Sequence, residues 1–429
     1  MKVALAVPSD PPGVNNFNQV PIGALYTAAQ LRDHGVDVVF RDLRRGATDE
    51  DYRALASSDL AVVFSTDYDL AQCYPSLRPA AECVRRLRAA GPAPVVCAGS
   101  HAAAAPVMTG SFTGADSVVA GEFEFAVPAL VAHLAGGGAL PPVWPPNGQP
   151  VMATEADLAK LTTPAYDLAP IREYASEGFV DGNLRRVRSG LVLANRGCPF
   201  GCSFCYLFFG KRLRRRPIDS TLAELTTLHH DYGIEHFFFL DYTFTLDRAW
   251  VRELCAEIQA TGLDIGWICQ TRIDCLDDEL LRLMRASGCT GIWLGVESPE
   301  LDQRRYLGKG RIGFDAIQDG VALVRRAGIE VLAFVMVGLP NETESSLRSL
   351  NDWLAESDVY YSLSTFQRRI GTPLAAESGA LPQDWSCLDA RSEYLGESRL
   401  RVADLDWFHA YHASSRRLVA NVMRGQVVS

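Results

Sequence analysis

The chain has 429 residues, of which 48% are hydrophobic and 21% charged, a balance that excludes a disordered or fibrous protein. This length accommodates two or three domains with a large buried core. Lys and Arg number 41 against 51 Asp and Glu, so the net charge of −10 offers no overall basic surface to nucleic acid. No apolar run approaches the ~18 residues that span a bilayer. We therefore expect neither nucleic acid nor a membrane as a partner.

The first residues favour a β-strand over a signal peptide. Their apolar stretch is short and stops at Pro8, without a small-residue cleavage site. We therefore expect a cytoplasmic protein. In that reducing compartment the 11 cysteines would be free thiols, metal ligands or catalytic groups rather than a disulfide framework.

Short apolar segments alternate with helical segments over residues 1–140. This alternation predicts an α/β fold, with a doubly wound, Rossmann-like parallel sheet covered by helices on both faces. Ligands of such sheets bind beyond the carboxyl ends of the strands. The predicted strands are residues 2–7, 37–40, 60–64, 94–97 and 117–120, and the predicted helices are residues 21–34, 75–90 and 122–134.

A stretch rich in Gly and Pro separates the two halves of the chain between residues 136 and 150. We assign residues 141–189 to a linker, which looks irregular and polar from residue 151 onwards. Two short basic runs, residues 185–188 and 212–216, are interpreted as solvated loop or helix faces.

The strand and helix alternation restarts at Leu191. It predicts a partial (β/α) barrel over residues 190–370, whose active site would lie at the carboxyl ends of the strands. Residues 371–429, helical between 405 and 423, would cap this barrel. The predicted strands are residues 191–195, 236–240, 264–269, 291–296, 330–337 and 360–365, and the predicted helices are residues 220–232, 248–261, 277–287, 314–327 and 342–356.

Three cysteines follow the first strand of this second half. Cys198, Cys202 and Cys205 have the spacing C-x-x-x-C-x-x-C, and Pro199 and Gly201 allow the loop between them to curl. Three thiolates on so short a loop can reach three corners of an iron–sulfur cube. The fourth iron would then be open to an exogenous ligand.

The alternatives are a zinc site and a group of buried thiols. Zinc usually takes four ligands, commonly as two spaced pairs. The nearest histidines, His229 and His230, lie more than 20 residues further on in a predicted helix. Buried thiols alone would not explain three cysteines in a Pro- and Gly-containing loop directly after a strand.

The cysteine loop resembles the signature of radical S-adenosylmethionine (SAM) enzymes, whose fold is also a partial barrel. The resemblance implies that the three cysteines hold a [4Fe–4S] cluster and that the amine and carboxylate of SAM chelate its unique iron. Electrons would come from a flavodoxin- or ferredoxin-like donor. Reductive cleavage of SAM would give a 5′-deoxyadenosyl radical.

The resemblance extends to segments at the ends of the later strands. By this resemblance Asp241 would approach the SAM amine, Arg272 its carboxylate, and Glu297 the ribose or a neighbouring polar atom. A helix cap, a surface ion pair and a barrel-rim hydrogen bond are the respective structural alternatives. The further candidate SAM contacts are Tyr206 next to the third cysteine and Gly338, Leu339 and Pro340 near adenine.

The first half resembles the cobalamin-binding domain that precedes the barrel in a large radical SAM subfamily. Residues 21–25, 98–101 and 119–124 carry this resemblance, because small residues at strand ends admit a flat macrocycle. The D-x-H-x-x-G motif of other cobalamin enzymes is absent, as it often is in this subfamily. The candidate cobalamin contacts are Ser65, Gly99, Ser100, His101, Gly121 and Glu122.

The other cysteines form no second compact motif, which argues against a methylthiotransferase with an auxiliary cluster. They are Cys73, Cys83, Cys97, Cys255, Cys269, Cys275, Cys289 and Cys387. Aromatic residues near the predicted mouth could line a substrate pocket, although core packing is the simpler interpretation. They are Tyr206, Phe208, Phe209 and Trp293.

The sequence as a whole predicts a radical SAM enzyme that abstracts hydrogen from an unactivated carbon of a small molecule. The favoured reaction is cobalamin-dependent C-methylation, as in antibiotic pathways. One alternative omits methyl transfer and ends in dehydration, rearrangement, epimerisation or cyclisation, for example of a sugar-derived natural product. Another is a non-enzymatic metal sensor. The sequence indicates neither the substrate, nor catalytic residues of the protein itself, nor the oligomeric state.

Overall fold

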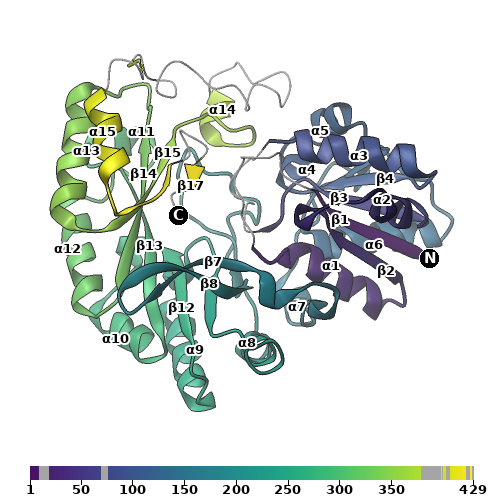
Figure 1. Cartoon of the computed structure of the whole chain (residues 1–429), viewed down its shortest axis with the longest axis horizontal. Helices are drawn as coiled ribbons and strands as arrows, with labels where there is room; N and C mark the ends of the chain where they lie inside the picture. The colour runs from purple at the N-terminus through teal and green to yellow at the C-terminus, as the bar shows by residue number, and fades with distance from the viewer. Residues whose placement is uncertain are drawn as a thin grey trace.

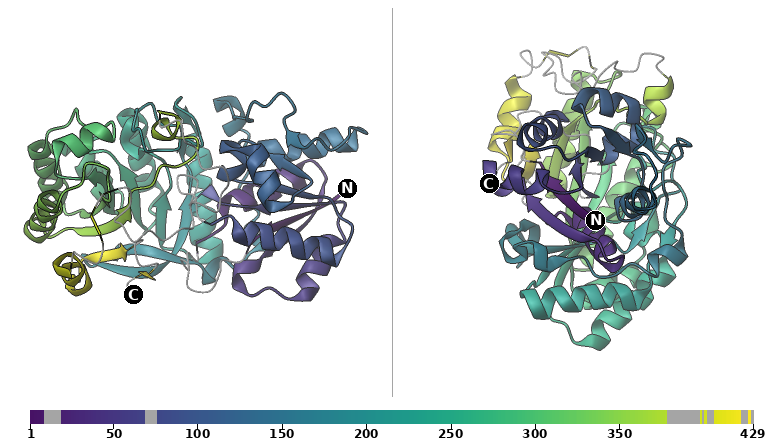
Figure 2. Two further views of the ribbon diagram at one scale, coloured as in Figure 1. Left: turned by 90° about the horizontal axis from the view of Figure 1, so that it is seen from above. Right: turned by 90° about the vertical axis from the view of Figure 1, so that its right-hand side faces the viewer.

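The computed structural model describes residues 1–8, 19–68, 76–377, 398, 400–401, 406–421 and 426–427. Cys73, Cys387 and most of the predicted cap lie outside these residues. Two α/β units stand side by side, the N-terminal one in purple and blue and the second in teal and green (Figures 1 and 2). In the described part of the chain, no helix combines the length and the apolar character that crossing a membrane requires.

The N-terminal unit is a doubly wound parallel sheet, as predicted. Its strands are β1 (Lys2–Val7), β2 (Asp37–Asp42), β3 (Leu60–Phe64), β4 (Val95–Ala98), β5 (Ser117–Val119) and β6 (Val143–Trp144). Its helices are α1 (Ile22–Asp33), α2 (Asp49–Ala56), α3 (Arg78–Ala90), α4 (Ser100–Ala104), α5 (Pro106–Thr113) and α6 (Phe123–Ala135). The sheet order is β2-β1-β3-β4-β5-β6, with every pair parallel.

The core of this unit follows the two-residue period of a strand. In β1, Val3 and Leu5 pack with residues of α1 and α6, whereas Ala4 and Ala6 pack with residues of α2 and α3. Both faces of the sheet are therefore covered, which is why its strands are continuous apolar runs. β3 is buried along its whole length.

The second unit is a curved, mostly parallel sheet, which confirms the predicted partial barrel. Its order is β17-β16-β15-β14-β13-β12-β11-β8-β7, and only the hairpin β7–β8 and the pair β16–β17 are antiparallel. The strands are β7 (Ala175–Val180), β8 (Asn183–Val192), β11 (His236–Phe239), β12 (Gly266–Thr271), β13 (Cys289–Glu297), β14 (Glu330–Val337), β15 (Tyr360–Thr365), β16 (Leu418–Asn421) and β17 (Gln426–Val427).

Helices connect the parallel strands along the outside of this sheet (Figure 1). The main ones are α8 (Ile218–Tyr232), α9 (Arg248–Thr261), α10 (Asp278–Ala286), α11 (Leu301–Tyr306), α12 (Phe314–Arg326) and α13 (Glu344–Ser357). The short elements are α7 (Glu155–Leu158), α14 (Pro373–Glu377), α15 (Asp406–Ser414) and the two-residue strands β9 (Asn195–Arg196) and β10 (Arg214–Arg215).

The sequence prediction lacked the short elements α2, α4, α5, β6 and α11. Two further segments were assigned differently. The part of the linker expected to be irregular contains the hairpin β7–β8, whose Asp181-Gly182 turn has φ values of 51° and 71°. Such a two-residue turn matches the twist of paired strands. The helix expected from residue 405 to residue 423 ends at Ser414, and β16 follows it because Leu418 extends the sheet beside Tyr361.

Candidate functional site

The cysteine loop starts from the small strand pair β9–β10. Gly197 has a φ of +91°, and a Cβ at this position would lie 2.0 Å from the carbonyl oxygen of Arg212. The Cys198 amide donates to the Gly210 carbonyl at 3.1 Å. Only glycine allows the backbone to approach Arg212 so closely. Gly197 therefore lets the start of the loop, at Cys198, pack against its end, at Gly210.

The segment around α11 holds the other side of the loop. Ser203 donates from its amide to the Leu307 carbonyl at 3.0 Å and from its hydroxyl to the Tyr306 carbonyl at 2.8 Å. Gly308 has a φ of +72° and packs so closely that a Cβ would lie 2.5 Å from the Gly201 carbonyl oxygen. The loop is thus fixed by residues about a hundred positions further along the chain.

The three thiols share one partly buried region. Cys198 Sγ lies 3.5 Å from Thr243 Oγ1, and Arg272 Nη1 lies 3.7 Å from Cys202 Sγ. Burial raises the pKa of Cys202, and it raises the pKa of Cys205 to about 12. Thiolates at this site therefore require positive charge beside them, as iron ions would provide.

Three cysteines on one short loop match the donor set of an iron–sulfur cube. Among the residues described, no three His, Cys, Asp or Glu side chains come together as ligands of one metal ion. In a cube each thiolate binds a different iron, so its ligands need not converge on one point. Cys205 nevertheless lies within electrostatic range of both Cys198 and Cys202.

Arg272, at the end of β12, lies against the cysteine loop. Its guanidinium is bonded to both oxygens of Asp274 at 2.9 Å and lies 3.9 Å from the centre of the Phe200 ring. Its third nitrogen faces Cys202. The structure therefore brings together this residue and the cysteines, as the sequence predicted.

Glu297, at the end of β13, adopts a strained backbone with a φ of +65° beside a break in the register with β14. Its side chain is buried and accepts a bond from Lys309 Nζ at 2.6 Å. Burial alone would lower the pKa of Lys309, but Glu297 and Cys202 together outweigh this effect and raise it. The strain positions a carboxylate at the barrel mouth, where such distortions are often functional.

The sequence analysis missed Lys309. This ammonium also donates to the Gly295 carbonyl at 3.1 Å and lies within electrostatic range of Cys202 and Arg272. A Cβ at Gly295 would lie 2.4 Å from Lys309 Nζ. The signal that could have revealed it is the sequence Gly308-Lys309-Gly310, in which two small residues flank a lone Lys.

Asp241, after β11, is buried, and its carboxylate bonds the backbone. Its oxygens accept from the amides of Ala194 at 3.0 Å and Asn195 at 2.6 Å. Burial raises its pKa to about 7, although these two hydrogen bonds oppose the shift. Asp241 thus supports the strand end that leads into the cysteine loop, and its approach to a SAM amine stays a prediction.

The remaining SAM candidates are Tyr206, directly after Cys205, and the segment Gly338–Pro340 after β14. Gly338 has a φ of +82°, and its amide donates to Glu342 at 2.8 Å. Leu339 is buried with Leu307, whereas Pro340 is exposed. The Tyr206 ring is packed closely against Gly371, where a Cβ would lie 2.9 Å from the ring.

An open cavity lies beside these cations. It is a small hollow open to solvent, lined by Arg272, Arg304, Lys309 and Gly295 together with apolar side chains of Ile273, Leu294, Val296, Ile312 and Ile317. Mixed walls of this kind are typical of small-ligand sites. Trp293, in contrast, packs between Phe238 and Phe334, as core packing requires.

The cobalamin candidates cluster at the carboxyl ends of β3, β4 and β5. His101 is buried with Nδ1 3.2 Å from Ser65 Oγ, and Ser100 Oγ lies 2.7 Å from Thr66 Oγ1. Gly99 allows close packing against Ser65, because a Cβ would lie 2.2 Å from that hydroxyl oxygen. These residues form a connected polar group at one sheet edge.

Gly121 and Glu122 complete this edge. Gly121 has a φ of +119°, and a Cβ would lie 2.2 Å from the Val151 carbonyl oxygen. For Glu122 the structure shows a different use from the predicted cofactor contact. Its carboxylate is fully buried and forms ion pairs with Arg196 and Arg214. The run at residues 212–216, interpreted as solvated, therefore contains buried charges.

The carboxyl ends of both parallel sheets meet at the cysteine loop. Tyr68, after β3, contacts the rings of Phe208 and Phe209 at 5.8 and 5.0 Å between centroids. Phe123, after β5, contacts Phe208 at 5.4 Å. Ligands at these two edges would therefore be neighbours.

Residues 192–354 match the model of the Radical SAM superfamily. This span begins at the last residue of β8 and includes all three cysteines of the loop. This part of the chain is therefore a radical SAM domain, as the cysteine spacing predicted.

Two curated relatives match most of the chain. An uncharacterized methyltransferase of Pyrococcus horikoshii is 27% identical over 390 residues, covering 87% of this chain and 81% of the relative. A hopanoid C-2 methylase of Rhodopseudomonas palustris is 25% identical over 374 residues, covering 78% and 67%. Several other curated relatives are longer, and this chain spans less than half of each.

A solved structure shares the fold of both units. The radical SAM methyltransferase TsrM of Kitasatospora setae, solved with cobalamin and a [4Fe–4S] cluster bound, superimposes with a TM-score of 0.70 at 21% identity. The match covers 88% of this chain and 75% of TsrM.

Proposed function

We propose that this radical SAM protein is a cobalamin-dependent methyltransferase that transfers a methyl group to a carbon of a small molecule. The observation that supports this most is the meeting of the two sheet edges, where Tyr68 and Phe123 contact Phe208. Parallel sheets bind ligands beyond their carboxyl ends. One site for cobalamin and one for SAM would therefore open onto the same space.

Cys198, Cys202 and Cys205 would hold the cluster. A [4Fe–4S] cluster, when bound and reduced by a flavodoxin- or ferredoxin-like donor, supplies the electron that cleaves SAM and starts hydrogen abstraction. The chain itself fixes the loop through Gly197 and Gly308 and partly buries the thiols. This burial limits the access of water to the site.

Several side chains around Cys202 suit the groups of SAM. Arg272 and Lys309 offer two cations, which match a carboxylate. Glu297 is an acceptor for a ribose hydroxyl, and Gly338 remains a predicted neighbour of the adenine base. Asp241, Tyr206, Leu339 and Pro340 remain predicted neighbours of the nucleotide.

Cobalamin would lie at the carboxyl ends of β3 to β5 and, when bound, would carry the methyl group. Ser65, Ser100 and His101 offer hydrogen-bonding groups there, and Gly99 and Gly121 allow Ser65 and Val151 to pack closely against this edge. The proposal draws support from TsrM, which was solved with cobalamin bound. It also draws support from the methyltransferases among the relatives.

The experiment is an anaerobic assay of the full chain, reconstituted with iron, sulfide and hydroxocobalamin. SAM with a deuterated methyl group and dithionite are then added. We expect about four irons and one cobalamin per chain, with 5′-deoxyadenosine formed only in the presence of dithionite. Mass spectrometry of candidate small-molecule acceptors would show a deuterated methyl group on carbon.

The outcomes separate the alternatives. Protein that makes 5′-deoxyadenosine but retains no cobalamin would reject methyl transfer and favour dehydration, rearrangement, epimerisation or cyclisation. Protein that binds zinc, or a cluster that does not respond to SAM, would reject the radical reaction altogether.

A further inference from the structure

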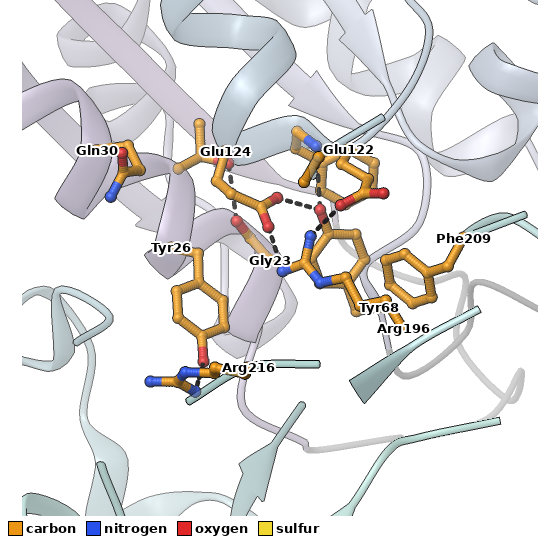
Figure 3. Close-up of polar contacts among 12 residues, drawn as sticks. Gly23, Tyr26, Gln30, Tyr68, Glu122, Glu124, Arg196, Phe209 and Arg216 are labelled. Carbon is orange, nitrogen blue, oxygen red and sulfur yellow. Dashed lines mark hydrogen bonds and ion pairs between the residues drawn. The ribbon is translucent and has the colours of Figure 1, made fainter. Parts of the chain in front are cut away.

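Two buried ion-pair networks connect the N-terminal unit to the barrel. Figure 3 shows Arg196 with Glu122 and Glu124 in one of them and Arg216 beside Tyr26 in the other. We name them by their central arginines. The Arg196 network consists of Tyr68, Glu122, Glu124, Arg196 and Arg214, and the Arg216 network consists of Tyr26, Tyr166, Arg216 and Glu224. Their arginines Arg196 and Arg216 are both 1% exposed.

In the Arg196 network two carboxylates meet two guanidinium groups. Arg196 bonds Glu122 through Nη1 and Glu124 through Nη2. Arg214 bonds the second oxygen of Glu122 at 2.5 Å and the Phe209 carbonyl at 2.7 Å. Charges of opposite sign thus balance, as burial of charged groups requires.

Tyr68 links this network to the backbone of the N-terminal unit. Its hydroxyl bonds Glu124 and accepts from the Phe123 amide at 3.0 Å. Its ring is stacked on Phe123 with 4.5 Å between centroids. The Arg196 guanidinium lies 5.4 Å from the centre of the Tyr68 ring and 5.2 Å from that of Phe209.

The placement of these contacts along the chain is informative. Arg196 directly precedes Gly197 and Cys198, while Phe208 and Phe209 follow Cys205. Both ends of the cysteine loop are therefore bound to one segment of the N-terminal unit, Glu122–Glu124. Replacing a buried ion pair by apolar groups often stabilises a protein, so stability alone does not explain this network. Fixing one arrangement is the better-attested use of such pairs.

We infer that Arg196 is a positioning residue that holds the cysteine loop in register with the carboxyl end of the N-terminal sheet. The inference rests on the proposed function, because the register matters only when both edges carry cofactors. Arg196 touches neither cofactor in this assignment and acts through Cys198. By holding the cysteine loop in place, Arg196 would fix the distance between the bound cluster and the cobalt ion of bound cobalamin.

The Arg216 network supplies a matched control. Tyr26 on α1 donates to Glu224 on α8 at 2.6 Å and accepts from Arg216 at 2.7 Å. Tyr166 donates to the other oxygen of Glu224 at 2.7 Å. This network joins the same two units with the same chemistry, but it binds α8 rather than the cysteine loop.

The test compares Arg196→Lys with Arg216→Lys in the reconstituted holoprotein. The reduced cluster and cob(II)alamin are both paramagnetic, so pulsed EPR measures the distribution of distances between them. We expect Arg196→Lys to broaden this distribution at least twofold and to shift the EPR signal of the reduced cluster. Arg216→Lys should change neither, although both variants unfold at a lower temperature.

Tyr68→Phe and Tyr26→Phe form a milder pair in case the Arg variants do not fold. Each variant removes one hydroxyl from its network. Only Tyr68→Phe should broaden the distribution of distances between the cluster and the cobalt ion. Equal distributions in wild type, Arg196→Lys and Tyr68→Phe would overturn the inference, and so would equal broadening by the control variants. A wild-type protein that shows no cluster–cobalt interaction at all would instead reject the proposed function.

Discussion

Lys309 Nζ lies 2.6 Å from Glu297 Oε1 in a buried pair next to Cys202. These two residues come from different segments, the end of β13 and the loop after α11. Their pairing places a cation beside the predicted site of the SAM carboxylate and an acceptor beside the predicted site of its ribose.

Lys309→Met should weaken SAM binding at least tenfold, because it removes a cation from the predicted carboxylate site. It also leaves Glu297 buried without its partner, which costs about 3–5 kcal/mol of stability. The measurement is a SAM titration monitored by the EPR spectrum of the reduced cluster, together with the unfolding temperature.

A double variant separates the two effects. Lys309→Met with Glu297→Gln removes the unpaired charge and should recover much of the lost stability without recovering SAM affinity. Arg305→Met, which removes an exposed ion pair with Asp302, is the control for charge alone. Unchanged SAM affinity in Lys309→Met would contradict the assignment.

Cys202→Ala should lower the iron and sulfide content of the reconstituted protein and abolish 5′-deoxyadenosine formation, because a cube with two thiolate ligands is poorly held. Cys83→Ala is the control, since that thiol is buried in the N-terminal core among Leu55 and Leu87. It should cost about 1 kcal/mol of stability and leave the cluster intact. A Cys202→Ala protein that still cleaves SAM would exclude the cluster assignment.

His101→Ala should reduce the cobalamin retained after gel filtration, because the imidazole is part of the polar edge at β4. The expected loss is at least fivefold, with iron content unchanged. His133→Ala, an exposed histidine of the same unit, is the control. Equal cobalamin content in both variants would show that His101 does not contribute to the proposed cobalamin site.

Much of the fold could be predicted from local patterns. The strand β3 is a continuous apolar run because both faces of its sheet are covered, and the pattern is visible in Leu60–Phe64. The hairpin β7–β8 was missed because its basic run, which includes Arg185 and Arg186, suggested a solvated loop or helix face. The turn Asp181-Gly182 was its detectable signal.

The candidate site was predictable only where its residues are close in sequence. The cysteine spacing identified the cluster loop, but Lys309 reaches it through tertiary packing of Gly308 on Gly201. Arg196 and Glu122 are far apart along the chain, and a buried Arg looks like a solvated one until its partner is known. Ion pairs between residues far apart in the sequence could therefore be identified only in the structure.

The buried carboxylate of Asp241 should make stability depend on pH. Its pKa is raised from the ordinary 3.8 to about 7 by burial, so the folded state holds a proton that the unfolded state releases between these values. The stabilisation that Asp241 contributes is therefore fully present below pH ~4 and is lost as the pH rises towards 7. From pH 5 to pH 7.5 the loss should be about 2–3 kcal/mol.

The variant Asp241→Asn isolates this effect, because Asn does not ionise. Its amide group faces one of the two backbone amides at Ala194 and Asn195, so it loses a hydrogen bond and is less stable than wild type at pH 5. The difference should shrink as the pH rises to 7.5, where wild type carries a buried charge.

Asp247→Asn is the control, because Asp247 caps α9 through the Trp250 amide. The pKa of Asp247 is lowered, since that cap and Arg215 outweigh its partial burial. Asp247 is ionised in both the folded and the unfolded state between pH 5 and 7.5. The stability difference between Asp247→Asn and wild type should therefore stay constant over this range. A constant difference for Asp241→Asn as well, measured by denaturant unfolding of the cofactor-free chain, would show that Asp241 is ionised throughout and held by its two amides alone.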